Sequence, residues 1–252
     1  MWLVGLALTV GMKVAGLTAE PAASEYRLAD YLVAPLRVHL LAAEDEPALC
    51  TTLTTADMER ILAKIDRVWS QAGIGFYLES VVREAPAPLE AAGGGFRRPL
   101  LTDLIPPGSY AADAFNVYYI KDFDVNGIYF PKAIFVKDTA ALQSVEGGID
   151  EPLPRVTAHE LGHALGLPHR QDTFNLMASG TTGITLNAAE IEIARGQALT
   201  MGRFARAGDW LGEADALFGA GKEKKAGELY RRLSALPLAS ETLTRVRERL
   251  AR

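Results

Sequence analysis

The sequence predicts an α+β fold with a small all-α appendage at its C-terminal end. Three observations support this: short alternating apolar segments before residue 140, a helical period in residues 54–71, and a purely helical pattern from Ala207 onward. Alternation with a period of two is typical of half-buried strands, and spacings of three and four are typical of helices. The 252 residues, 49% of them hydrophobic, suffice for one ordinary domain plus an appendage.

Four segments are predicted to be strands, because apolar and polar residues alternate in them or β-branched and aromatic residues gather there. They are residues 36–42, 74–82, 114–121 and 132–137. The intervening residues 84–109 are rich in proline and glycine and are predicted to form a long loop. His39, in the first strand, is expected to be a half-buried or surface residue and not a metal ligand.

The first long helix is predicted over residues 54–71. Thr54 or Thr55 can cap its start, and Gly73 ends it. Its apolar face is predicted to comprise Met58, Ile61, Leu62, Ile65, Val68 and Trp69.

Eleven residues, from His159 to His169, read H-E-x-x-H-x-x-G-x-x-H and contain three of the four histidines of the chain. On a helix, His159 and His163 lie one turn apart on the same face, where two imidazoles can bind one zinc ion. Gly166 tolerates a positive φ, so the helix can end there and the chain can bring His169 back as a third ligand. Three protein ligands leave the fourth position of a tetrahedral zinc open, as in catalytic sites.

Glu160 lies beside these histidines, where its carboxylate can take a proton from a metal-bound water. A purely structural zinc site would not need this carboxylate. The sequence therefore predicts one catalytic zinc ion and a hydrolytic enzyme. The alternative is a catalytically inactive zinc-containing binding or scaffold protein.

The motif resembles the zinc signature of the metzincin metalloproteases. Met177, eight residues after His169, strengthens the resemblance, because metzincins place a methionine in a tight turn beneath the zinc ligands. The gap is similar to that of the matrixin branch, and the resemblance is tight over residues 154–195. The chain departs from the family at Arg170, where matrixins usually carry Ser, astacins Glu and adamalysins Asp. The matrixin cysteine-switch propeptide and the astacin tyrosine are also absent.

This resemblance implies a catalytic domain over residues 20–206, with a twisted mixed sheet, an active-site helix and a C-terminal helix. It implies a zinc endopeptidase with Glu160 as general base and a protein or peptide as substrate. The implied zinc ligands are His159, His163 and His169, and the implied structural supports of the site are Met177 and Gly166. An edge strand between Gly127 and Val136 would pair with the substrate backbone.

The last helix of this domain is predicted to begin at Asn187. Asn187 can cap it, Glu190 can reach back to the cap, and Leu186 can pack on Ile191.

The appendage is predicted over residues 207–252 and resembles one tetratricopeptide repeat, a helix pair of about 34 residues. The resemblance is carried by Trp210, Ala214, Leu217, Gly221, Ala226, Tyr230, Leu233 and Pro237. One helix pair cannot bury its own apolar face, so it would pack on the catalytic domain, on residues 240–252, or on another protein. Contact with a protein partner is therefore a candidate role. Its basic residues alternate with apolar ones, which favours a solvated helix surface over a nucleic-acid patch.

Residues 1–12 are apolar but too short to span a bilayer comfortably, so no stable membrane span is predicted. Residues 1–19 resemble a secretory signal peptide and predict export, although no basic residue precedes the apolar run. The alternative is an ordinary buried or disordered N-terminus. The net charge of −5 indicates no general attraction to nucleic acid, and the single cysteine, Cys50, excludes an intramolecular disulfide.

A calcium ion is a further candidate cofactor. Asp122, Asp124 and Asn126 lie close together in the sequence and could supply oxygen ligands. The other interpretation of these residues is a solvated turn.

Overall fold

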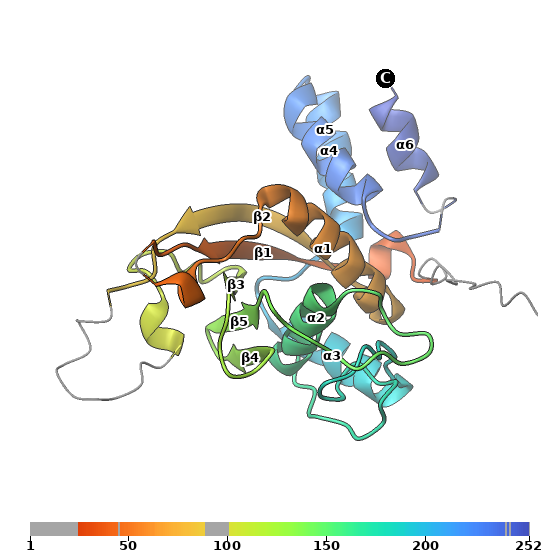
Figure 1. Cartoon of the computed structure of the whole chain (residues 1–252). Helices are drawn as coiled ribbons and strands as arrows, with labels where there is room; N and C mark the ends of the chain where they lie inside the picture. The colour runs from red at the N-terminus through yellow and green to blue at the C-terminus, as the bar shows by residue number, and fades with distance from the viewer. Residues whose placement is uncertain (1–24, 45, 89–100, 240, 242, 252) are drawn as a thin grey trace, which may run out of the picture.

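The structure is a computed structural model that describes residues 25–44, 46–88, 101–239, 241 and 243–251 (Figure 1). The predicted signal peptide, residues 1–19, lies outside these ranges, as does much of the loop predicted over residues 84–109. None of the helices in the described ranges combines the length and the apolar character needed to cross a bilayer.

A mixed β-sheet forms the centre of the larger part of the molecule, in the strand order β2–β1–β3–β5–β4 (Figure 1). These strands are β1 (Leu32–Leu41), β2 (Ile74–Glu84), β3 (Phe115–Ile120), β4 (Gly127–Phe130) and β5 (Ala133–Lys137). The first three and β5 are parallel, and β4 runs antiparallel to β5 at one edge. A two-residue strand, β6 (Ala205–Arg206), pairs antiparallel with the start of β1. The predicted α+β fold with a mixed sheet is confirmed.

Two of these strands differ from the prediction. β4 was not among the four predicted strands, but it lies at the start of the range, between Gly127 and Val136, in which the resemblance implied an edge strand. β1 begins at Leu32, four residues before the predicted start. The sequence did not indicate this earlier start, because Pro35 lacks an N–H and proline argues against a strand. The pairing of β1 with β2 is irregular just after Pro35, between Leu36 and Arg37.

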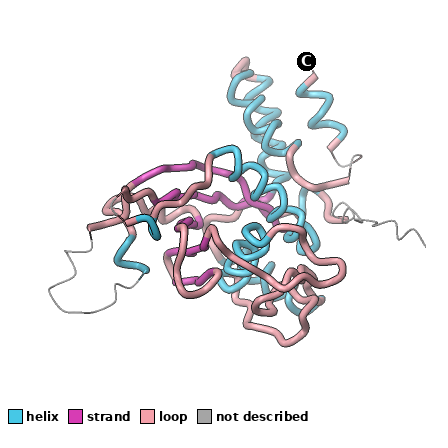
Figure 2. Tube along the Cα trace, viewed as in Figure 1, coloured by secondary structure: helices cyan, strands magenta, loops and turns pink. Residues whose placement is uncertain are grey.

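Six α-helices accompany the sheet in the described ranges, and Figure 2 shows them together with the long loops that join them. They are α1 (Thr55–Trp69), α2 (Pro152–Ala164), α3 (Ala188–Thr200), α4 (Ala207–Gly219), α5 (Glu223–Ser234) and α6 (Thr244–Leu250). Short 3₁₀ turns are η1 (Leu28–Asp30), η2 (Pro47–Leu49), η3 (Ser70–Ala72) and η5 (Leu101–Leu104).

The predicted helix caps are present. Thr54 and Asp57 form a reciprocal capping box at the start of α1, and Asn187 and Glu190 form one at the start of α3. Gly73 has a φ of 60° and closes the turn after α1, as expected from its freedom to adopt the left-handed conformation. Local sequence therefore determines where these helices begin and where the first one ends.

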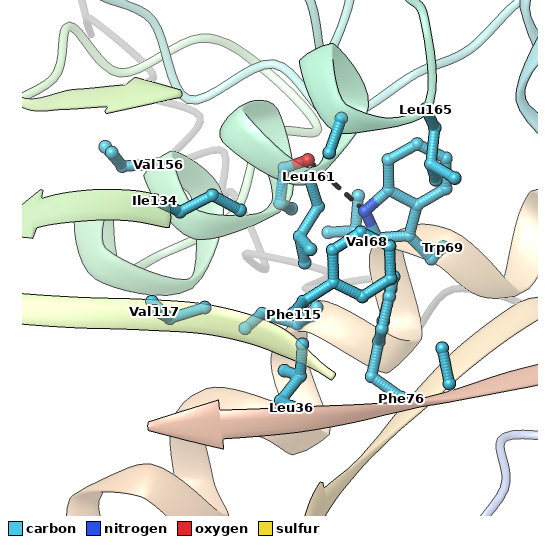
Figure 3. Packing of buried hydrophobic residues seen from close by; sticks show 14 of the residues in the cluster. Leu36, Val68, Trp69, Phe76, Phe115, Val117, Ile134, Val156, Leu161 and Leu165 are labelled. Atoms are coloured by element: carbon cyan, nitrogen blue, oxygen red, sulfur yellow. Dashed lines mark hydrogen bonds between the residues drawn. The ribbon is translucent and has the colours of Figure 1, made fainter. Parts of the chain in front are cut away.

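The main core lies between one face of the sheet and the helices α1 and α2. Leu36 of β1, Phe76 of β2 and Phe115 of β3 point toward these helices (Figure 3). The predicted apolar face of α1 is buried here, apart from the half-buried Leu62. The indole N–H of Trp69 donates a hydrogen bond to the backbone oxygen of Ala158, 3.3 Å away, and so ties α1 to α2 (Figure 3).

The three C-terminal helices stand together beside the sheet, in the blue part of Figure 1. Their buried residues include Ala214, Tyr230 and Val246, which form a second apolar cluster with Tyr31 and Val33 at the start of β1. Val33 alternates with the β1 residues of the main core, so these helices pack on the opposite face of the strand. The pair α4–α5 thus packs both on the sheet and on α6, and its assignment to the tetratricopeptide family stays a prediction.

His39 was expected to be half-buried or at the surface, and this was wrong. It is fully buried, its Nδ1 lies 2.5 Å from Oε1 of Glu84, and its ring stacks on Tyr118 at 4.1 Å between centroids. The reason is tertiary: β1 lies between β2 and β3, and these neighbouring strands supply Glu84 and Tyr118.

Asp66 on α1 is buried, and its Oδ1 accepts a hydrogen bond of 2.7 Å from the backbone N–H of Phe76. Burial raises its pKa from 3.8 to about 8. Between these values the folded chain binds one proton more than the unfolded chain, so the free energy of unfolding falls as pH rises.

We expect Asp66→Asn to remove this part of the pH dependence, because Asn keeps an acceptor oxygen for Phe76 and does not ionise. Between pH 5 and pH 8 the substitution should gain roughly 2–4 kcal/mol of stability relative to wild type. Urea unfolding of both proteins at the two pH values measures this, and the difference isolates Asp66 because all other titrating groups are shared. An equal pH dependence in both proteins would contradict the assignment.

Candidate metal centre

The helix α2 carries three of the candidate site residues. Pro152 occupies its first turn, where the fixed φ of proline suits a helix and its missing N–H costs nothing. Glu151, just before it, accepts a hydrogen bond from Arg60 and lies 2.9 Å from the ammonium group of Lys64 on α1. These contacts fix the start of α2 to α1, while its length places His159, Glu160 and His163 in the last two turns.

Gly166 ends α2 in the way its sequence position predicted. Its φ is 83°, its N–H donates to the oxygen of His163 at 3.0 Å, and the N–H of Leu167 donates to the oxygen of Gly162 at 2.9 Å. This pair of bonds is a Schellman motif, which reverses the chain direction after a helix. The reversal brings His169 next to the two histidines of α2.

The three imidazoles surround one point. Their ring centroids are 4.7 Å apart for His159 and His163, 4.6 Å for His163 and His169, and 5.2 Å for His159 and His169. One nitrogen from each ring lies within 4.8 Å of the others, and the Nε2 atoms of His163 and His169 are 3.1 Å apart. Two Zn–N bonds of about 2.0–2.1 Å at a tetrahedral angle separate their nitrogens by roughly 3.3 Å. The three residues therefore fit one zinc ion.

Backbone oxygens fix the tautomers of two of these histidines. Nδ1 of His159 lies 2.8 Å from the oxygen of Leu176, and Nδ1 of His163 lies 2.8 Å from the oxygen of Leu167. A carbonyl oxygen can only accept, so each Nδ1 carries the proton and each Nε2 keeps its lone pair. Burial lowers the pKa of His159 to about 3 and also lowers that of His163, so both rings are neutral, as metal ligands must be.

Met177, which the resemblance placed beneath the zinc ligands, packs against α2. It is fully buried, and a Cβ atom added to Gly162 would lie 2.5 Å from its sulfur atom. Its N–H donates to Oδ1 of Asn175 at 2.7 Å, and its oxygen accepts from the N–H of Arg170 at 2.9 Å. Gly162 was not predicted as a site residue, although a glycine inside a helix often marks a close contact of this kind.

Glu190 connects the third histidine to the methionine turn. It is fully buried, and its carboxylate accepts hydrogen bonds from Arg170 at 2.6 Å and from the side chain of Asn175 at 2.8 Å. Arg170 follows His169 directly, and Asn175 begins the turn of Met177. The sequence indicated Glu190 only as a helix cap, because its other two partners are 15 and 20 residues away.

Glu160 is buried beside the three histidines. Burial raises the pKa of its carboxyl to about 7, against the opposing effects of the Arg155 charge and of a hydrogen bond from the Tyr129 backbone. A Cβ atom on Gly127 would lie 2.9 Å from Oε1 of Glu160, so the edge strand β4 packs closely against this side chain. A carboxyl with a pKa near neutrality can both accept and return a proton at pH 7.

A hollow of about 380 Å³ lies at this centre. His159, Glu160 and His169 line it, together with residues 124–127 before and at the start of β4 and with Ser179 and Gly180 after the methionine turn. Two of the candidate ligands and the candidate base therefore face a space that can admit part of another molecule.

The calcium prediction receives no support. The side-chain amide of Asn126 donates to and accepts from the backbone of Ala141, and Asp122 accepts a hydrogen bond of 3.2 Å from Thr139. Within the described ranges, the group of His, Cys, Asp or Glu side chains close enough together to bind one ion consists of the three histidines, and it includes neither Asp122 nor Asp124. Asp122 and Asn126 are instead hydrogen-bonded to the segment of residues 137–141.

No protein-family model matches this sequence, and no curated protein matches it. Among solved structures, mirolysin in complex with a compound is similar at 12% identity and a TM-score of 0.46, over 66% of this chain and 91% of that one. Archaemetzincin from Methanopyrus kandleri is similar at 14% identity and a TM-score of 0.41, over 67% and 96%. A zinc-dependent peptidase from Methanocorpusculum labreanum has 14% identity and a TM-score of 0.35, over 66% and 99%.

Proposed function

We propose that this chain is a zinc-dependent endopeptidase in which His159, His163 and His169 bind the ion and Glu160 is the general base. The observation that supports it best is the convergence of three imidazoles beside a buried carboxyl whose pKa is about 7, at the wall of an open hollow. We further propose that it belongs to the metzincin clan and is most similar to its matrixin branch, because of the position of Met177.

Zinc bound at this centre would polarise the scissile carbonyl and lower the pKa of a coordinated water to about 7. The chain itself supplies the proton transfers: Glu160 accepts the proton of the attacking water on its carboxylate and then delivers it to the nitrogen of the leaving amine. The Nδ1–H bonds of His159 and His163 hold their rings in place throughout. Met177 supports the base of the site and does not react.

The proposed substrate is an extended stretch of protein or peptide. β4 ends the strand order of the sheet and packs against Glu160, so its outer edge could pair with a substrate backbone next to the base. We also propose that the chain is exported, because residues 1–19 resemble a signal peptide. Residues 207–252 pack on the start of β1, and we propose that their remaining surface contacts a protein partner.

The proposal predicts about one zinc ion per purified chain and hydrolysis of a generic unfolded protein. A chelator should abolish both, and added zinc should restore both. Metal analysis and the release of fluorescence from a labelled, unfolded substrate measure these quantities on the same sample. A folded chain without stoichiometric zinc would contradict the metal centre. A zinc-loaded chain that cleaves neither unfolded protein nor a peptide library would favour the zinc-containing binding or scaffold protein.

A further inference from the structure

Arg155 is a buried cation one helical turn before His159. Its exposed fraction is 2%, and within the described ranges it forms no ion pair with a carboxylate. Burial lowers its pKa to about 10, which leaves it charged at neutral pH. A buried charge needs partners, so the identity of those partners indicates what the residue does.

The partners of Arg155 are three backbone oxygens. Its Nε donates to the oxygen of Gly183 at 3.1 Å, and its Nη2 donates to the oxygens of Asn175, at 3.3 Å, and of Ala178. For Ala178 and Gly183, no other hydrogen bond in the described ranges reaches the oxygen. The planar guanidinium, with donors pointing in fixed directions, suits such a set of separate acceptors.

All three oxygens belong to residues 175–183, the segment that contains the methionine turn. The oxygen of Leu176, within this segment, is the acceptor that orients His159. Ser179 and Gly180, also within it, line the hollow. Arg155 therefore fastens to α2 the segment that orients a metal ligand and forms one wall of the hollow.

Arg155 also contacts His159 directly, but this contact cannot orient the ring in place of the Leu176 oxygen. Nη1 of Arg155 lies 3.2 Å from Nδ1 of His159, but a guanidinium has only donors. When Nε2 binds a metal, Nδ1 carries the proton and must find an acceptor, which is the oxygen of Leu176. Arg155 acts on His159 through the position of that oxygen.

We propose that Arg155 is a positioning residue for this centre, which holds residues 175–183 so that Leu176 orients His159 and the wall of the hollow keeps its place. The expected change in KM rests on the proposed peptidase function, whereas the expected change in zinc affinity requires only the metal centre. The peptidase function and the role of Arg155 can therefore fail separately.

Arg195 on α3 provides a matched control. It also donates to three backbone oxygens, those of Ala72 at 2.8 Å, Gly73 at 3.1 Å and Asp30 at 2.8 Å. None of these oxygens belongs to the metal centre. Arg195→Met therefore removes a comparable set of bonds elsewhere, whereas Arg155→Met removes them at the centre, and both replace the guanidinium by an apolar side chain.

The experiment uses the full-length chain and compares zinc affinity, measured by competition with a chromophoric chelator, in wild type, Arg155→Met, Arg155→Lys and Arg195→Met. Folding is checked by circular dichroism, and kcat and KM are measured on a peptide. We expect Arg155→Met to weaken zinc binding by about 10–100-fold, the range for residues that orient ligands, and to raise KM. Arg155→Lys should lose less zinc affinity than Arg155→Met, because its ammonium group still donates to some of the three oxygens. Arg195→Met should keep zinc affinity within about twofold of wild type.

Wild-type zinc affinity in folded Arg155→Met would overturn the proposal, as would an equal loss in Arg195→Met, which would indicate general destabilisation. If Arg155→Met does not fold, folded Arg155→Lys decides: weakened zinc binding supports the proposal and unchanged binding overturns it. If wild type binds zinc but cleaves no peptide, the peptidase function fails, and the affinity comparison still tests Arg155.

Discussion

Glu160→Gln is expected to keep about one zinc ion per chain and to lose peptidase activity by at least about 10²-fold, the scale of a lost general base. Gln matches the volume of Glu, so the close packing against Gly127 is preserved. The three histidines and their backbone partners are untouched, which is why zinc should remain. The amide cannot accept the proton of the attacking water, which is why turnover should fail.

The measurement is kcat/KM on one peptide, with zinc content determined on the same preparation. Glu192→Gln is the matched control, because Glu192 is exposed on α3 and its substitution removes the same charge outside the centre. The control should retain wild-type activity. Comparable activity in Glu160→Gln and wild type would show that Glu160 is not the base, and loss of zinc from Glu160→Gln would show that it supports the metal instead.

The parts of this centre that could be predicted are those encoded by local spacing. The helical repeat determines that His159 and His163 share a face, and the positive φ of Gly166 determines that the chain turns back toward them. The capping boxes of α1 and α3 are likewise set by residues three positions apart. In each case the interacting groups are close in sequence, so a single pattern contains both partners.

The parts that could not be predicted depend on partners far away in the sequence. Arg155 bonds oxygens 20–28 residues later, and nothing about an arginine on a helix indicates which carbonyls it will reach. His39 is buried by neighbouring strands that supply Glu84 and Asn116, 45 and 77 residues later. An edge strand was expected between Gly127 and Val136, but the four half-buried residues of β4 alternate over too short a stretch to give its bounds or register.

His163→Ala is expected to remove most of the zinc while leaving the fold intact. The Nε2 of His163 lies 3.1 Å from that of His169 and faces the point that the three rings surround, so its loss leaves two ligands on an ion that needs three from the protein. The loss of a direct ligand should exceed the 10–100-fold loss in affinity that follows from removing a residue that only orients one.

The backbone should tolerate this change. Alanine is the best helix former, and the Schellman bonds after α2 involve only main-chain atoms, so the return of the chain to His169 does not depend on the imidazole. The direct cost is the lost Nδ1–H bond to Leu167, typically about 1 kcal/mol.

The fourth histidine separates ligand loss from loss of stability. His39→Ala removes an imidazole that is hydrogen-bonded to Glu84 and stacked on Tyr118, away from the metal centre, so it should lower the melting temperature and keep one zinc per folded chain. Zinc is measured by metal analysis after gel filtration of each folded variant. Because His39→Ala gives up more buried contacts than His163→Ala, a selective loss of zinc in the latter can only come from the missing ligand. Stoichiometric zinc in His163→Ala would refute its assignment.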